Sequence, residues 1–222
     1  MKLIVLNHKM NLLYNELDEY INRINKINKN IIIAPSNIYL LKFLENTNHQ
    51  IASQDVCYID DGNYTGKVSW SQIKSLGIKY SLIGHSEKND TIDKINYKLR
   101  ICIDNNITPI LCFGNSEKEE PITNVLDKLE NLNDKIIYAY EPVFNIGTNK
   151  IDISYIKENI KNIYNYLINK NITNPKILYG GGITKNNINE IYHIKNISGI
   201  ILGSNSSNID ILEKTLLEID EK

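Results

Sequence analysis

The fold of this chain is decided by residues 138–150, which read YAYEPVFNIGTNK. They include the end of an apolar run at 136–140 that has the length and the composition of a β-strand. Glu141 is the first charged residue after this run, and Pro142 follows it. Because proline lacks a backbone donor and disfavours helical dihedral angles at the residue before it, the strand must end at Glu141. The pattern therefore places a carboxylate at the C-terminal end of a strand.

The loop after this strand is more apolar than a solvated turn. It carries three bulky apolar side chains, those of Val143, Phe144 and Ile146. Gly147 allows backbone to approach a ligand closely, and a helical pattern begins near Asp152. Two interpretations are open for this stretch alone. Glu141 is a catalytic base beneath a lid, or it caps the strand ahead of an ordinary βα loop.

Length, charge and cysteine content narrow the class of protein. The 222 residues suit one domain over 1–222, and the formal net charge of −1 argues against a general nucleic-acid surface. The three cysteines have no metal-ligand spacing, which favours a reducing compartment and predicts no metal site. We expect no signal peptide, and no run reaches the roughly 20 apolar residues of a membrane span. The prediction is a cytoplasmic globular protein that binds neither membranes nor nucleic acids.

Short apolar runs alternate with longer polar segments along the whole chain. The strand-like runs lie at 3–6, 31–34, 51–52, 80–83, 110–113, 136–140, 177–179 and 200–202. Between most of them, apolar residues recur at helical spacing. Eight strands alternating with helices predict an α/β fold of parallel βαβ units and favour a closed (β/α)8 barrel, although an open doubly wound sheet fits the same pattern. Segment 117–133 has room for one short helix, so we expect a barrel smaller than the roughly 250 residues typical of the class.

Two polar residues stand a few positions past the ends of predicted strands. Lys9 follows the first strand, and His85 follows the fourth, after Gly84. A lysine just past a strand is usually solvated, and a lone histidine is usually a satisfied polar residue. Barrel enzymes nevertheless place their chemistry on this face. The position therefore favours an anion-binding Lys9 and a His85 ring that points into the mouth of the barrel.

Glycine-rich segments follow the last two predicted strands. They read YGGG at 179–182 and LGSNS at 202–206. Consecutive glycines free backbone N–H groups to face one point, and a helix N-terminus behind them adds a positive dipole. A pair of such loops after strands seven and eight of a barrel predicts a phosphate site.

With these residues in place, the chain resembles the triosephosphate isomerase family. The matching segments follow the family's order and cover nearly the whole chain: NHKMN at 7–11, GNYTG at 62–66, IGHSE at 83–87, YEPVFNIGT at 140–148 and YGG at 179–181. The resemblance implies a single-domain TIM barrel with eight parallel strands. It also implies an isomerase that interconverts dihydroxyacetone phosphate and D-glyceraldehyde 3-phosphate without a cofactor, in glycolysis and gluconeogenesis.

The resemblance assigns roles to particular residues. As is known for the family, Glu141 would move a proton between adjacent carbons, while a neutral His85 would polarise the carbonyl and shuttle protons between the oxygens. Lys9 would pair with the phosphate and stabilise the enediolate, with Glu87 as a helper beside the site. Substrate binding would fall to Asn7, Lys9, Ile146, Gly147, Gly182, Gly203 and Ser204. Closure of a lid at 143–150 would exclude water.

The loop at 62–67 resembles one that family members insert into a neighbouring subunit. Thr65 would then lie near the neighbour's active site, and we predict a homodimer. Lys67 stands where the family usually has a Glu that pairs with position 88. Lys67 would face Lys88 instead, which predicts a weaker dimer.

The departures from the family's pattern leave the proton-transfer groups intact. They include His8 and Phe144 in place of tryptophans, Asn115 in place of a Glu, Gly182 in place of a Ser, and Asn149 in place of the lid Gly that bonds to that Ser. We expect weaker lid closure from the last two. The alternatives are another barrel isomerase of phosphosugars, which would not need the Lys9, His85 and Glu141 set, and a barrel kept for binding or structure alone, which would be expected to lose one of the three.

Overall fold

The computed structural model describes residues 1–59, 61–145, 147 and 151–220. The sequence predictions for Ile146 and Asn149 lie outside these residues.

Within the described residues, eight parallel strands follow one another around a closed barrel in chain order. They are β1 Leu3–Asn7, β2 Ile31–Ala34, β3 Gln50–Ser53, β4 Tyr80–Ile83, β5 Thr108–Phe113, β6 Ile137–Tyr140, β7 Lys176–Gly180 and β8 Gly199–Leu202. The barrel closes where β8 pairs with β1 and Ile201 lies opposite Val5. The predicted barrel is therefore confirmed, the open sheet is excluded, and each predicted run overlaps one strand.

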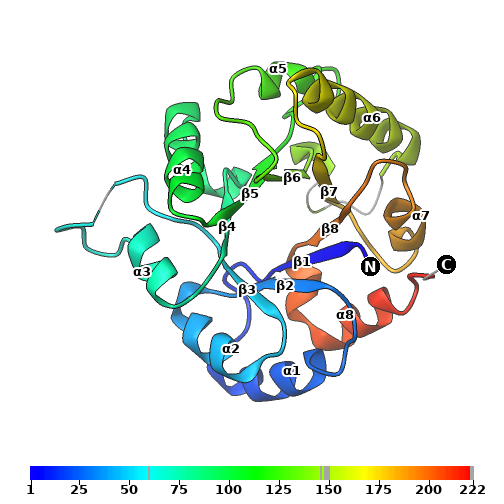
Figure 1. Ribbon diagram of the computed structural model, residues 1–222. Coiled ribbons are helices and arrows are strands. Elements are labelled where there is room, and N and C mark those ends of the chain that lie inside the picture. The colour runs from blue at the N-terminus through cyan, green and yellow to red at the C-terminus, as the bar shows by residue number, and fades with distance from the viewer. Residues whose placement is uncertain (60, 146, 148–150, 221–222) are drawn as a thin grey trace.

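Helices surround the barrel as an outer ring (Figure 1). They are α1 Leu17–Ile24, α2 Leu40–Asn46, α3 Trp70–Ser75, α4 Ile92–Asp104, α5 Ile122–Leu126, α6 Ile153–Asn169, α7 Ile188–Tyr192 and α8 Ile209–Leu216. The short α5 is the helix expected in segment 117–133. No helix in the described part of the chain is long and apolar enough to cross a membrane.

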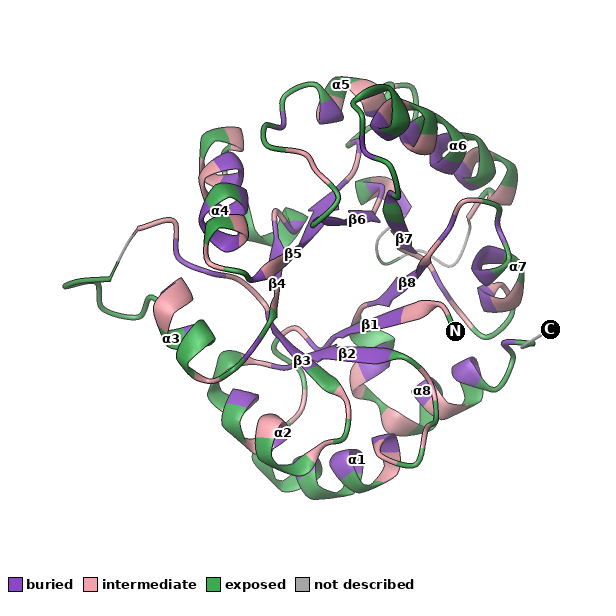
Figure 2. Cartoon of the chain, viewed as in Figure 1, coloured by how far each residue is buried: buried purple, intermediate pink, exposed green. Residues whose placement is uncertain are grey.

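The core has two layers because successive strand residues point to opposite faces. Val5, Leu82 and Leu178 belong to the cluster inside the barrel. Their neighbours along the strands pack between the barrel and the helices, whose buried positions face inward (Figure 2). Strands that are buried on both faces read as continuous apolar runs, which is why the sequence showed them clearly. The three cysteines, Cys57, Cys102 and Cys112, are free thiols and are buried.

All the strands end at one rim of the barrel, and this geometry brings distant loops together. The turn from β4 into His85 depends on Gly84, whose φ is +77° and where an added Cβ would lie 2.9 Å from the carbonyl oxygen of Cys112. A side chain there would be strained by the left-handed backbone conformation and would also clash with a backbone atom. Glycine therefore allows the chain to leave β4 at an angle that holds His85 at the rim.

Candidate active site

A cavity of about 210 Å³ opens at the rim formed by the C-terminal ends of the strands. It lies between the loops that follow β1, β6, β7 and β8. Six residues singled out in the sequence line it: Lys9, Glu141, Gly147, Gly182, Gly203 and Ser204. Asn7 and His85 lie beside this cavity and are not part of its lining.

Glu141 holds its carboxylate in an unusual environment. Its backbone N–H donates a 2.8 Å hydrogen bond to the carbonyl oxygen of Phe113, which continues the β5–β6 pairing beyond the strand. The residue is half-buried, but the Oε1 atom is buried and has no hydrogen-bond partner among the described residues. Burial raises the pKa of this carboxyl above its ordinary value, while Lys9, the Cys112 thiol and a positive charge on His85 would oppose the rise. A carboxylate that is poorly solvated is a stronger base than one in water.

Gly180, at the end of β7, makes the space that this carboxylate occupies. A Cβ added there would lie 2.8 Å from Cγ and 2.9 Å from Oε2 of Glu141, and 2.5 Å from Cγ2 of Ile201. From the sequence, the glycine run predicts only a phosphate cradle and gives no sign of this role. The strand register supplies the missing signal, because it sets which β7 residue faces the end of β6.

Lys9 is held from several sides in a left-handed backbone conformation, with φ of +53°. Its N–H donates to Oδ1 of Asn7 (3.1 Å), and Nε2 of Gln54 donates to its carbonyl oxygen (2.7 Å). The ammonium group donates to Oε1 of Glu87 at 2.5 Å. Its Cε lies 3.6 Å from the position that a Cβ would take at Gly203, so the side chain runs beside the last glycine loop. No sequence signal pointed to Gln54.

His85 is 5% exposed and begins a short 3₁₀ helix, Ser86–Lys88. The backbone N–H of Glu87 donates to its Nδ1 at 3.3 Å. A ring nitrogen that accepts a hydrogen bond carries no hydrogen, so in this arrangement the ring is neutral and its hydrogen is on Nε2. The histidine is also close enough to Glu141 that a positive charge on its ring would lower the pKa of that carboxyl. The ring can thus donate a hydrogen bond without carrying a charge.

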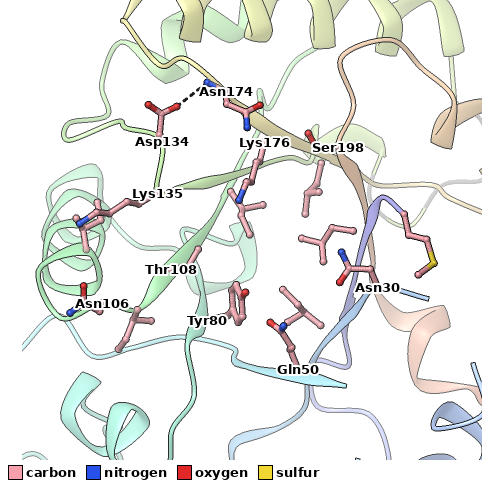
Figure 3. Close-up of a pocket in the computed structure, with 17 residues that line it drawn as sticks. Asn30, Gln50, Tyr80, Asn106, Thr108, Asp134, Lys135, Asn174, Lys176 and Ser198 are labelled. Carbon is pink, nitrogen blue, oxygen red and sulfur yellow. Dashed lines mark hydrogen bonds between the residues drawn. The ribbon is translucent and has the colours of Figure 1, made fainter. Parts of the chain in front are cut away.

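A larger cavity of about 670 Å³ lies at the opposite end of the barrel (Figure 3). First residues of strands line it, among them Gln50, Thr108 and Lys176, and these three side chains are partly or fully exposed. None of the residues singled out in the sequence lies there. Barrel enzymes place their active sites at the other, C-terminal face, so we assign the chemistry to the smaller cavity.

Comparison with known proteins agrees with this geometry. The family model described as Triosephosphate isomerase matches residues 2–218. The chain belongs to the triosephosphate isomerase family. A protein of that name from Buchnera aphidicola subsp. Baizongia pistaciae is 34% identical, with 97% of this chain and 98% of the relative covered. A protein of that name from Orientia tsutsugamushi (strain Ikeda) is 33% identical, with 95% of this chain and 94% of the relative covered.

A triosephosphate isomerase from Ureaplasma parvum serovar 3 is 32% identical over 97% of this chain and 98% of its own length. The match therefore extends over the whole barrel and not only over the loops that carried the resemblance. The sequence prediction of a triosephosphate isomerase family member is confirmed, and the chain is an enzyme of the isomerase class.

Proposed function

We propose that the protein interconverts dihydroxyacetone phosphate and D-glyceraldehyde 3-phosphate by proton transfer through an enediolate. The observation that carries this proposal is the Glu141 carboxylate. Its Oε1 is buried without a hydrogen-bond partner in the described part of the chain, and its pKa is raised by burial. It also lines a cavity together with Lys9 and backbone of two glycine-rich loops. A substrate carbon next to this oxygen would give it the proton that it lacks.

The neighbouring groups suit the charge that develops in this reaction. Removal of a proton from carbon places negative charge on the substrate oxygens. Nε2–H of a neutral His85 can donate to such an oxygen, and the ammonium group of Lys9 can stabilise its charge. Asn7 accepts from the Lys9 N–H through Oδ1, and its Nδ2 has no protein acceptor among the described residues. We assign Nδ2 to the substrate oxygens.

The phosphate group of the substrate would bind at the other end of the cavity. The backbone of Gly147, Gly182, Gly203 and Ser204 lines that region, and Lys9 supplies a positive charge. Ile146 is assigned to the same binding set from the resemblance alone. No metal or cofactor takes part in the proposed reaction.

We also propose a homodimer formed through the loop that contains Thr65, with the barrel of residues 1–222 as one catalytic domain. Tyr64, in this loop, is 50% exposed, which suits burial against a partner. Lys88, which would face Lys67 of the neighbour, lies 3.1 Å from Oδ2 of Asp55 in its own chain. That pairing should reduce the repulsion between the two lysines. Activity in cytoplasmic glycolysis and gluconeogenesis follows from the reaction proposed.

An isomerase assay coupled to the oxidation or reduction of the triose product tests the reaction. The wild-type protein should convert each triose phosphate into the other. Glu141→Asp keeps the charge but withdraws the carboxylate, and a displacement on the order of 1 Å costs roughly a hundredfold in rate. Activity of this variant within a factor of two of wild type would refute the role of Glu141. A wild-type protein with no isomerase activity would refute the proposed function.

A further inference from the structure

His8 stands between two residues of the proposed site, Asn7 and Lys9, yet its own side chain is fully buried in the layer between barrel and helices. Its ring packs edge-on against Tyr20 of α1 and Phe43 of α2, with centroid distances of 4.8 and 5.4 Å. A buried imidazole is costly unless its polar atoms find partners. Nδ1 of this ring has no hydrogen-bond partner among the described residues, whereas Nε2 lies beside Tyr20, which connects the ring to another loop of the site.

Tyr20 links His8 to the loop after β8. Its hydroxyl lies 2.7 Å from the carbonyl oxygen of Ser206 and 2.9 Å from Nε2 of His8. Because a carbonyl oxygen can only accept, Tyr20 donates its one hydrogen to Ser206. The hydroxyl must then accept from His8, so the histidine carries its hydrogen on Nε2. Burial lowers the pKa of His8 to about 3, and the direction of this chain of hydrogen bonds is therefore the same throughout the neutral pH range.

Ser206 belongs to the loop that we assign to the phosphate. It is fully buried in the short 3₁₀ helix Ser204–Ser207. Its N–H donates to the carbonyl oxygen of Gly203 at 2.8 Å, and its Oγ donates to that of Asn7 at 3.4 Å. The loops after β1 and β8 are thus joined by a long direct bond and by the shorter His8–Tyr20–Ser206 chain.

The two loops are not equally well anchored without this chain. Lys9 has separate contacts to Asn7, Gln54 and Glu87. The backbone of Ser206 is held by its bond to Gly203, inside the same loop, and by the bond to Tyr20. Loss of the Tyr20 hydroxyl would leave a buried carbonyl and a buried N–H without partners, which favours a shift of the loop after β8. The N–H groups of Gly203 and Ser204 would move with it.

We infer that His8 and Tyr20 are positioning residues, which set the place of the Gly203–Ser204 backbone relative to Lys9 and thereby the affinity for the phosphate group. This inference rests on the proposed function, because it takes that loop as part of the phosphate site. The phosphate is remote from the reacting carbons, but its binding energy also helps to hold the reacting part of the substrate in place. A change at this point weakens phosphate binding and lowers kcat/KM.

Tyr20→Phe removes only the hydroxyl oxygen and its hydrogen. We expect the competitive inhibition constant of inorganic phosphate to rise about three- to tenfold for one lost hydrogen bond, and kcat/KM to fall by a similar factor. Tyr138→Phe is the matched control. Its hydroxyl is also a donor to a backbone carbonyl, that of Asn133 at 2.9 Å, but it lies at the other end of the barrel. This variant should lose stability and keep both constants.

Two substitutions of His8 distinguish the effect of its hydrogen bond on the loop from the effect of its packing. A glutamine amide can place an N–H near the position of Nε2, so His8→Gln should retain more phosphate affinity than His8→Leu. The inference is overturned if Tyr20→Phe loses stability as Tyr138→Phe does but keeps kcat/KM and the phosphate inhibition constant at wild-type values. Calorimetry with inorganic phosphate measures binding without turnover. A wild-type protein that binds phosphate in this way but does not isomerise trioses refutes the proposed function alone, whereas one that does not bind phosphate overturns this inference.

Discussion

Gly180→Ala should disable the enzyme while leaving its phosphate site intact. The residue has no positive φ that would itself require glycine, so the effect of a methyl group comes from space alone. The added Cβ would lie 2.8 Å from Cγ and 2.9 Å from Oε2 of Glu141. On its other side it would lie 2.5 Å from Cγ2 of Ile201. Something must move, and the identity of the moving group decides the outcome.

The size of the movement follows from these distances. Carbon atoms in favourable contact are about 3.5 Å apart or more, so the approach to Glu141 Cγ is short by about 0.7 Å and that to Ile201 Cγ2 by about 1 Å. Ile201 is β-branched and buried in the barrel, with little rotational freedom. The end of the Glu141 side chain is free to turn, and it should be displaced by close to 1 Å. A displacement of that order costs roughly a hundredfold in rate.

The coupled isomerase assay and thermal unfolding together test this expectation. The kcat of Gly180→Ala should fall about a hundredfold, while the inhibition constant of inorganic phosphate should stay near its wild-type value. Tyr20→Phe should instead raise that inhibition constant. Overpacking should reduce the stability by about 1–3 kcal/mol without preventing folding. A folded Gly180→Ala protein with kcat within threefold of wild type would refute the inference that this glycine makes room for the base.

Other expectations follow from the same site. Lys9→Met should lower kcat, by about 10²–10³ if the charge stabilises the enediolate, as well as raise KM; a normal kcat with only a higher KM would contradict that role. Glu141→Gln should raise the free energy of unfolding at pH 7. The folded-state pKa of Glu141 is above 4.5, so the wild type loses stability as the pH rises from 4.5 through the folded-state pKa. Urea unfolding should show this gain at pH 7 and little of it near pH 4, and an equal difference at both would contradict it. Sedimentation should detect a dimer through the Thr65 loop, and a fully active monomer at high concentration would exclude it.

The sequence was sufficient to predict the order of strands and helices, because the patterns that indicate them are local and repeated. Each strand is buried on both faces and appears as an apolar run, and the helices between them show their own spacing. A chain of such units has few ways to pair its strands, since parallel βαβ connections have one hand. Only the closure of β8 on β1 distinguishes the barrel from an open sheet, and no local pattern carries that information.

The sequence also located the chemical groups that line the site. Glu141 follows β6 directly, Lys9 lies just past the end of β1, and the glycine-rich loops follow the last two strands. In a closed parallel barrel every residue of this kind lies at one rim, so position along the chain is enough to bring them together. The 210 Å³ cavity is the result.

Only the tertiary structure determines which groups hold this site in place. Tyr20 and Ser206 are 186 residues apart and lie within hydrogen-bond distance only because α1 packs beside the loop after β8. Gly180 makes room for Glu141 because the strand register places the two ends side by side. Such contacts depend on differences of a few tenths of an ångström in the positions of groups from different βα units. A sequence pattern records which residues face the core or the rim, but it does not record which of them touch.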